Sequence, residues 1–328
     1  MLLRNARRWW TAKGSHAALR IAPALPASAI SMVEWFVGRL GPRLPVLAKV
    51  VADNMRSADL YSPDVLRAYF NQVALHLSNA VRVFRIGRIE GEVGRLARSQ
   101  VDVDDSISHV HHALSSGRGA VIVPPHVCNY LLTLVRLNQE APVDVYLRWS
   151  KDGRRQDLKR AWCESAGLSV ILEPASEADP TSRAARCVEA LQRGAALVMT
   201  PDIAQKADKG VAVDLLGRRA YLPTGPASIA MLAGAPLVPV FGRLERDTHV
   251  ITARPPIEVE SLSRSQGGRK ASIQRAMQAW VQSFEAFLRK NPQAWFLWGD
   301  SRWTRVFRGD PEYAAALSQA DDGGVDSQ

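Results

Sequence analysis

Cysteine is scarce in this chain of 328 residues, and its three copies, Cys128, Cys163 and Cys187, form no CxxC pair. This spacing argues against a disulfide framework or a thiolate metal site and is typical of a protein from a reducing compartment. The sequence also has no histidine–cysteine cluster at metal-ligand spacing and no GxGxxG motif. We therefore expect neither a metal ion nor a bound cofactor.

Long uncharged hydrophobic runs are absent too, as is a secretory signal. The apolar stretch at residues 30–52 contains Glu34, Arg39, Arg43 and Lys49. Each charge costs about 2.5–3.5 kcal/mol at the centre of a membrane-spanning helix, whereas a helix lying in the membrane interface tolerates it. Residues 1–60 are therefore predicted to form a basic leader and interfacial helices. A packing helix behind a basic leader, or a transit peptide, is the alternative.

Acidic residues are few in the body of the chain. The whole sequence has 42 Lys and Arg against 32 Asp and Glu, a net charge of +10. Residues 309–328 hold five of the acids and no basic residue, so 42 basic residues face 27 acidic ones elsewhere, a balance of +15. Such a body favours an anionic membrane surface or an acidic carrier protein as partner. Nucleic acid is not expected, because no recognition motif accompanies the charge. The acidic tail, 309–328, is predicted to be disordered.

Short β-branched apolar segments alternate with amphipathic ones through the middle of the chain. The expected strands are residues 120–124, 143–149, 168–172, 195–200, 236–242 and 248–253; the expected helices are 62–83, 104–114, 130–137, 154–166, 182–192, 226–232 and 271–287. This alternation predicts an α/β fold with a mostly parallel central sheet flanked by helices on both faces. We assign this domain to residues 61–308.

Functional groups gather at the carboxyl ends of strands in such a sheet. His126, Arg148 and Asp202 occupy these positions. Of seven histidines, only His126 stands between a buried strand and a helix N-terminus, a common way to present a catalytic base. Asn129, three residues later, is a candidate N-cap of that helix.

A second predicted helix start follows the basic pair Arg218 and Arg219. Thr224 is a candidate N-cap and Pro226 suits a first helical turn. The free N–H groups of such a turn attract phosphate, although an ordinary capped helix explains the same residues.

Five blocks in a fixed order carry a resemblance to a known family. They are VADNMRSA with Asn54, the strand followed by HVCNY, LQRGAALVMTPDIAQ, VDLLGRRAYLPTGPASIAMLAGAPLVPVF and NPQAWFLWGDSRW. In order and spacing they resemble the bacterial lipid A biosynthesis (lauroyl/myristoyl) acyltransferases, within the lysophospholipid acyltransferase superfamily. The resemblance covers residues 45–307.

The chain departs from the family pattern at two places. The family histidine is followed five positions later by Asp or Glu, and here that position is Leu131. The family's C-terminal His-Arg-Arg-Trp-Lys is Asp-Ser-Arg-Trp-Thr at 300–304. Asp202, in the family's Asp-Gln position, is the best replacement for the missing acid, so the catalytic candidates are His126 and Asp202. A degenerate fold that acts as a lipid-binding or accessory subunit is the alternative.

The resemblance implies a peripheral or monotopic enzyme on the cytoplasmic face of the inner membrane. It implies transfer of a fatty acyl chain from acyl carrier protein, or from acyl-CoA, to a hydroxyl of a glycolipid or phospholipid, with a lipid A-type acceptor favoured. Such transfer needs a base, a donor for the oxyanion and alignment of two substrates. The substrate-binding candidates are Asn129, Arg148, Arg183, Arg218, Arg219, Thr224 and Gly225.

For three features of the sequence, a purely structural explanation stands beside the functional one. Cys128 is a conceivable nucleophile, but it is better explained as a small core residue. The basic run that begins at Arg148 contacts acidic headgroups or a carrier protein, or else is a solvated helix face. Trp295, Trp298 and Trp303 form either an interfacial belt or core packing.

Overall fold

The computed structural model describes residues 26–87, 89–127, 129–148, 153–173, 180–260 and 268–315, without the side chains of residues 27, 154, 155, 180–183 and 315. The basic leader up to residue 25, Cys128 and the tail from residue 316 lie outside these ranges. The predictions made for those segments are therefore not addressed by the structure.

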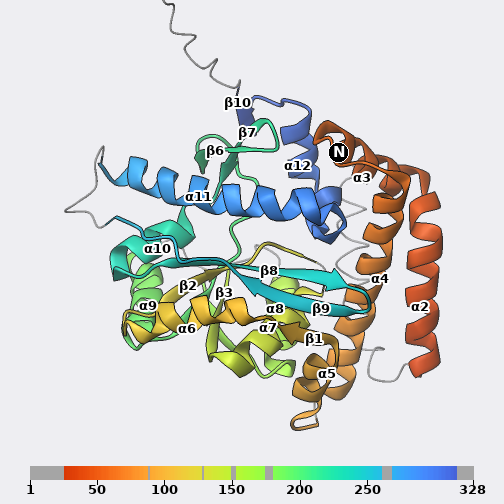
Figure 1. Cartoon of the computed structure of the whole chain (residues 1–328), viewed down its shortest axis with the longest axis horizontal. Helices are drawn as coiled ribbons and strands as arrows, with labels where there is room; N and C mark the ends of the chain where they lie inside the picture. Colours follow the sequence, from red (N-terminus) through yellow and green to blue (C-terminus); the bar gives the residue numbers. More distant parts are fainter. Residues whose placement is uncertain are drawn as a thin grey trace, which may run out of the picture.

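A sheet with the strand order β1-β9-β8-β2-β5-β3-β4 forms the centre of the protein (Figure 1). Its strands are β1 (Val101–Val103), β2 (Ala120–Val123), β3 (Val143–Leu147), β4 (Ser169–Leu172), β5 (Ala196–Val198), β8 (Leu237–Glu245) and β9 (Thr248–Ala253). The neighbours from β4 to β8 are parallel, whereas β9 runs antiparallel to β8 and β1 runs parallel to β9. The predicted α/β fold with a mostly parallel sheet is confirmed.

Two hydrophobic cores lie on opposite faces of this sheet. Val121 and Val123 of β2 belong to one core, and Ala120 and Ile122 belong to the other, as expected for a strand covered on both sides. One face carries α9 (Pro180–Gln192), α10 (Gly225–Ala233) and α11 (Gly268–Lys290); the other carries α5 (Glu92–Gln100), α6 (Ser108–Ser115), α7 (Tyr130–Glu140) and α8 (Gly153–Ser165). Figure 1 shows α11 along one face and α6 along the other.

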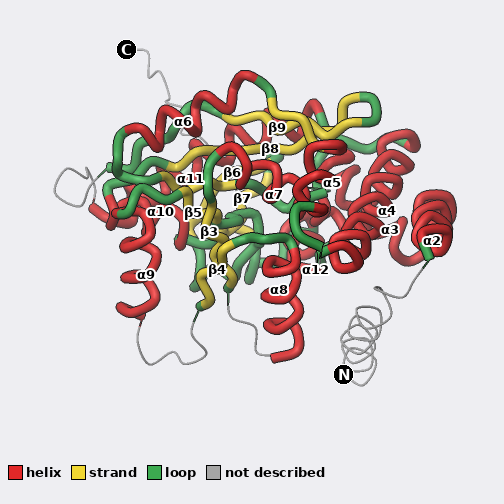
Figure 2. The backbone as a smooth tube through the Cα atoms, turned by 90° about the horizontal axis from the view of Figure 1, so that it is seen from below, coloured by secondary structure: helices red, strands yellow, loops and turns green. Residues whose placement is uncertain are grey.

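Three N-terminal helices stand beside one end of the sheet (Figures 1 and 2): α2 (Ala27–Leu40), α3 (Pro45–Ser57) and α4 (Pro63–Ile86). α4 begins after Ser62, whose hydroxyl accepts a hydrogen bond from the Val65 N–H at 3.1 Å. α2 packs along α4, and an ion pair of 3.3 Å joins Glu34 to Arg82. Among the described helices, none combines the length and the hydropathy that crossing a membrane requires.

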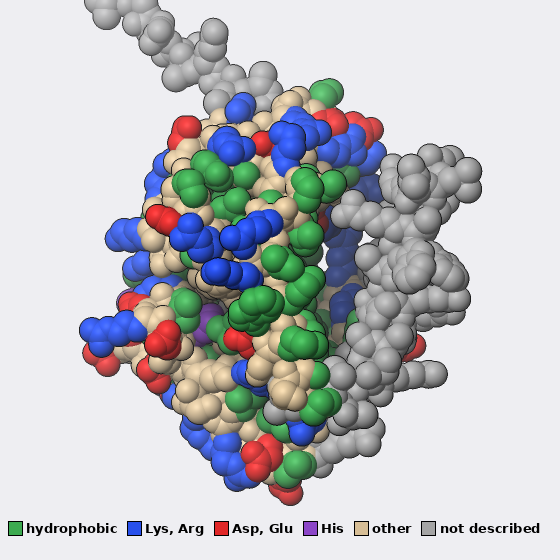
Figure 3. Space-filling model, turned by 90° about the vertical axis from the view of Figure 1, so that its right-hand side faces the viewer, with side chains coloured by type: hydrophobic (Ala, Val, Ile, Leu, Met, Phe, Trp, Pro, Cys, Tyr) green, Lys and Arg blue, Asp and Glu red, His purple; other side chains and the backbone are tan. Residues whose placement is uncertain are grey.

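The outward side of α2 and of the turn into α3 is apolar. Seven large hydrophobic side chains are exposed there: Met32, Val33, Trp35, Phe36, Leu44, Val46 and Leu47. We call these seven residues the apolar face of α2–α3. Trp35 is 63% exposed and Val46 is 79% exposed, so neither is part of a core. Figure 3, viewed from the side of the molecule where α2 lies, shows a band of hydrophobic side chains beside a hollow in which a histidine is visible.

The sequence analysis missed a small second sheet. β6 (Val211–Leu215) and β7 (Arg218–Leu222) form an antiparallel hairpin, and β10 (Ala314–Ala315) pairs with β7. Leu216 and Gly217 connect the hairpin with φ angles of 51° and 69°, as a two-residue turn with both central residues left-handed requires. After α12 (Ser301–Phe307) the chain folds back, and Ala314 and Ala315 pair with Ala220 and Arg219 of β7.

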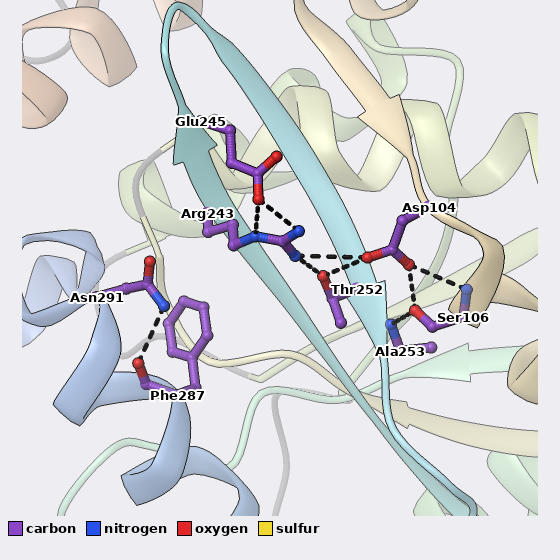
Figure 4. Close-up of polar contacts among 8 residues, drawn as sticks. All are labelled: Asp104, Ser106, Arg243, Glu245, Thr252, Ala253, Phe287 and Asn291. Carbon is purple, nitrogen blue, oxygen red and sulfur yellow. Dashed lines mark hydrogen bonds and ion pairs between the residues drawn. The ribbon is translucent and has the colours of Figure 1, made fainter.

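A cluster of polar side chains joins the end of β1 to the antiparallel strands β8 and β9 (Figure 4). Asp104, which precedes the short helix η3 (Asp105–Ile107), accepts hydrogen bonds from Thr252 Oγ1 at 2.9 Å and from Ser106 N at 3.1 Å. Arg243 of β8 bonds to Thr252 and lies 3.5 Å from Asp104. Burial works to raise the pKa of Asp104, but these donors and the charge of Arg243 lower it. The cluster ties three strands together through side chains.

Replacing Asp104 by alanine is expected to lower the free energy of unfolding by about 1–3 kcal/mol, because charged and neutral donors lose their acceptor. Since the folded pKa is depressed, this stabilisation is present above the unfolded pKa and is lost as pH falls through the folded value. Urea unfolding from neutral into acid pH measures both effects. Glu245→Gln, at the exposed partner of Arg243, is the control and should change stability by less than about 0.5 kcal/mol. Equal losses of stability in Asp104→Ala and Glu245→Gln would contradict the stabilising role assigned to Asp104.

Candidate active site

The loop that carries His126 is held by backbone contacts at both ends. After β2 and its two prolines, the Val127 N–H donates back to the Pro125 carbonyl at 2.9 Å. The Phe296 N–H donates to the His126 carbonyl at 2.9 Å, and Val127 forms an antiparallel bridge with Trp295. A segment far along the chain therefore helps to set the position of His126.

The carboxylate of Asp202 lies against the imidazole of His126. Asp202 Oδ1 is 2.6 Å from His126 Nδ1, and Oδ2 accepts hydrogen bonds from the His126 backbone N–H at 2.7 Å and from Trp295 Nε1 at 2.9 Å. Trp303 Nε1 donates to the Asp202 carbonyl oxygen at 2.8 Å. β2 and β5 are parallel neighbours, which is why the residues after them meet.

This geometry defines the free nitrogen of the imidazole. A carboxylate only accepts hydrogen bonds, so Nδ1 of His126 is assigned as the donor to Oδ1 and Nε2 is left as the basic nitrogen. Asp202 is 0% exposed, whereas the side chain of His126 is 29% exposed. The pair therefore presents only the imidazole to its surroundings.

Two opposing effects act on the pKa of His126. Burial lowers it, but the charge and hydrogen bond of the Asp202 carboxylate outweigh burial and raise the pKa above its usual value. Arg302 and Asp300, which pair with each other at 2.7 Å, add smaller contributions of opposite sign. His126 is thus a stronger base than a free imidazole, and it can accept a proton once pH exceeds its pKa.

A cavity of about 670 Å³ opens beside His126. Much of its wall is apolar and includes Leu131, Leu134, Val145, Trp162 and Ile229. Four cationic side chains also line it, from four different parts of the fold: Arg148 after β3, Lys159 on α8, Lys209 before β6 and Arg269 on α11. Among the described residues that line the cavity, Glu173 is the single acidic one. These walls suit an amphiphile with a long apolar chain and an anionic group.

Four of the predicted site residues line this cavity: His126, Arg148, Thr224 and Gly225. Thr224 does occupy the N-cap position of α10, but its hydroxyl makes no capping hydrogen bond. Its backbone is helical, with φ −79° and ψ −13°, instead of the extended conformation that side-chain caps usually adopt. The predicted N-cap position is therefore correct, but the side-chain capping hydrogen bond does not form. The N-terminus of α10 borders the cavity.

Arg218 and Arg219 are not among the residues that line the cavity. Both belong to β7, where Arg218 is exposed and Arg219 pairs with Asp214 at 3.7 Å. The hairpin, which the sequence analysis did not recognise, places both arginines in the second sheet, so they do not line the cavity with Thr224. Arg183 lies in α9, but its side chain is outside the described part of the chain.

Asn129 is 1% exposed and is also absent from the cavity wall. It stands before α7 with a left-handed backbone (φ 61°) and makes no side-chain cap. Its Oδ1 accepts from Asn79 Nδ2 at 3.0 Å, and its Nδ2 lies 3.2 Å from His249 Nδ1. Asn129 thus occupies the predicted N-cap position, but its side chain makes no capping hydrogen bond because a buried network holds the amide. Burial lowers the pKa of His249 to about 4, so that imidazole is neutral at physiological pH.

The tryptophans that the sequence left between two alternatives are core residues. Trp295, Trp298 and Trp303 are at most 1% exposed, so the interfacial belt is wrong. Trp295 and Trp303 pack edge to face at 4.9 Å, and both donate to Asp202. The sequence analysis missed this role. The available signal was that a buried indole N–H needs an acceptor.

His76 of α4 also lines the cavity, and the sequence analysis did not single it out. It lies three residues after Val73, on the side of α4 that packs inward, and this helical spacing was the available signal. Within the described ranges, no group of three or more side chains could hold a metal ion.

Asp202→Asn is expected to lower the pKa of His126, because the charge that raises it disappears while burial, which lowers it, remains. The Oδ2 position accepts two N–H groups, so the new amide NH₂ should face Nδ1 and move the imidazole proton to Nε2. NMR titration of histidine-labelled protein measures both the pKa and the tautomer. A His126 pKa that stays raised in this variant would contradict the assigned electrostatics.

Comparison with known proteins agrees with the resemblance seen in the sequence. Residues 63–305 match the family described as bacterial lipid A biosynthesis acyltransferase. A relative, the phosphatidylinositol mannoside acyltransferase of Mycolicibacterium smegmatis, is 28% identical over 235 residues, which is 71% of either chain. The family match begins with α4 and contains His126, Asp202, Trp295 and Trp303. The chain therefore belongs to the bacterial lipid A biosynthesis acyltransferase family and is an enzyme of the acyltransferase type.

Proposed function

We propose that this enzyme moves a fatty acyl chain from a thioester of acyl carrier protein or coenzyme A to a hydroxyl group of a glycolipid or phospholipid. A lipid A-type molecule is the favoured acceptor. The observation that carries the proposal is the His126–Asp202 contact of 2.6 Å beside a cavity with largely apolar walls. The name of the M. smegmatis relative, a phosphatidylinositol mannoside acyltransferase, agrees with a glycolipid acceptor.

In the proposed reaction, Nε2 of His126 takes the proton of the acceptor hydroxyl while its oxygen attacks the thioester carbonyl carbon. Asp202 keeps the imidazole in the required tautomer and stabilises the imidazolium that forms. When the tetrahedral intermediate collapses, the ester C–O bond remains and the C–S bond breaks. The departing thiolate then takes the proton from His126.

The walls of the cavity support both substrates. The apolar wall, including Leu131 and Leu134, suits a fatty acyl chain. Arg148, Lys159 and Lys209 suit phosphate groups, which occur in the phosphopantetheine arm of the donor and in many lipid headgroups. Leu131 was the feature that favoured a non-catalytic accessory subunit. A carboxylate that reaches His126 from the end of β5 weakens that alternative.

Transfer of a labelled acyl chain from acyl carrier protein or acyl-CoA into a bacterial lipid extract tests the proposal. The wild-type protein should make a labelled lipid, and His126→Ala should lower the rate by about 100- to 10,000-fold, the usual contribution of a general base. His112→Ala, at an exposed histidine of α6, should retain the wild-type rate. The rate should rise as pH passes the elevated pKa of His126. Equal rates with and without the His126 imidazole would rule out the mechanism.

The apolar face of α2–α3 is the proposed contact with the membrane. Exposed apolar side chains on a helix, with basic residues such as Arg39 and Arg43 nearby, are typical of interfacial helices on anionic lipid. The net charge of +10 acts in the same direction. Peripheral attachment to the cytoplasmic face of the inner membrane would bring lipid acceptors to the hollow beside this band (Figure 3).

Trp35→Ser and Phe36→Ser should each weaken binding to anionic liposomes by about 10- to 100-fold, since burying such a side chain contributes about 1.5–3 kcal/mol. Both side chains are exposed, so the thermal unfolding temperature should stay the same. Ile89→Ser is the matched control, because Ile89 is 57% exposed but lies outside this face. Co-sedimentation measures the binding. Unchanged binding in both aromatic variants, or an equal loss in the control, would exclude this surface.

A further inference from the structure

His76 is a second imidazole in the cavity, and the mechanism above gives it no role. Its ring packs against Phe296 with a centroid distance of 5.3 Å and against Trp162 at 6.0 Å. No side chain among the described residues forms a hydrogen bond with it. The ring nitrogens of His76 are therefore left for the molecule that occupies the cavity.

Phe296 connects the two histidines of the cavity. Its ring packs on His76, while its backbone N–H donates to the His126 carbonyl at 2.9 Å. Tyr69, two turns earlier on α4, donates to the Phe296 carbonyl at 3.1 Å and fixes the same segment to the helix. His76 of α4 and His126 of the loop after β2 therefore both contact Phe296, and both line the cavity.

Acyl transfer places negative charge on the carbonyl oxygen of the acyl group as the acceptor oxygen attacks. A donor fixed in advance at that position is often the largest single contribution to catalysis. We propose that His76 donates an N–H hydrogen bond to this carbonyl oxygen and stabilises the oxyanion. The inference rests on the acyl transfer proposed above and assigns the donor that the reaction requires.

The electrostatics of the two histidines suit different roles. Burial, with smaller contributions from the charges of His126 and His249, lowers the pKa of His76 to about 4, whereas Asp202 raises the pKa of His126. His76 is therefore neutral at physiological pH and is a donor that does not repel the imidazolium formed at His126. Titratable groups whose environments separate their pKa values in this way commonly divide catalytic tasks.

The proton of His76 stays on its ring throughout the reaction. The new C–O bond forms and the C–S bond breaks, with the electron pair of the broken bond leaving on the thiolate sulfur. The hydroxyl proton passes to Nε2 of His126 and then to that sulfur. His76 changes only the strength of its hydrogen bond, which grows as the carbonyl oxygen gains charge.

Two variants test the proposal. His76→Leu is close to histidine in volume, and His76→Gln keeps an N–H group that can donate a hydrogen bond. Both are assayed with the acyl donor and lipid extract that give product with the wild-type protein. The leucine variant should lower kcat by about 100-fold with little change in KM for the donor. The glutamine variant should recover part of the loss. In both variants the pH at which the rate rises should match wild type, because His126 sets it. His112→Phe, on the exposed side of α6, is the control.

Thermal unfolding checks that each variant is folded, and His76→Phe replaces the leucine variant if that one is not. A leucine variant with unchanged kcat, or one that alters KM alone, overturns the oxyanion role. A glutamine variant no better than leucine overturns it as well, since donation is the property tested. If the wild-type protein makes no labelled lipid, the proposed function fails and this inference fails with it. If the wild-type protein and the leucine variant are equally active, only the proposed role of His76 fails.

Discussion

A buried carboxylate is among the most costly groups in a protein interior unless hydrogen bonds compensate it, and Asp202 is 0% exposed. Its two side-chain oxygens receive the imidazole and backbone N–H groups of His126 and the indole N–H of Trp295. These donors come from the end of β2 and from the segment after α11. The contacts that compensate the buried charge are therefore the same contacts that orient the imidazole.

The sequence was sufficient to predict six of the seven strands of the central sheet, because they are short, largely apolar runs that must be covered on both faces. It did not predict the edge strand β1, which has only three residues with Asp102 at its centre. It also predicted that His126 and Asp202 stand at strand ends, and parallel pairing of β2 with β5 brings them together. The β6–β7 hairpin was not predictable in the same way. Charged residues such as Asp214 and Arg219 occupy its exposed side, and its further partner β10 lies far along the chain. For this reason the sequence did not show that Arg218 and Arg219 lie in a second sheet.

Side-chain direction outside the sheet depends on tertiary partners that local rules cannot supply. Asn129 stands where a helix cap is expected, yet Asn79 and His249 hold its amide. Trp295 has an apolar ring and a polar N–H, so its sequence position fits a membrane interface and a core equally well. Only the location of Asp202 decides between them. Leu131, in turn, belongs to the apolar wall, and the carboxylate approaches the imidazole from β5.

The hydrogen bonds of Asp202 connect residues 76, 93 and 101 positions apart along the chain. Contacts of such long range require the closure of long loops, which slows folding. Because synthesis proceeds from the N-terminus, a nascent chain contains His126 and Asp202 well before Trp295 and Trp303 have left the ribosome. An incomplete chain thus carries the reactive imidazole without the indoles that anchor its partner, and the site is assembled only when translation of the domain is nearly finished.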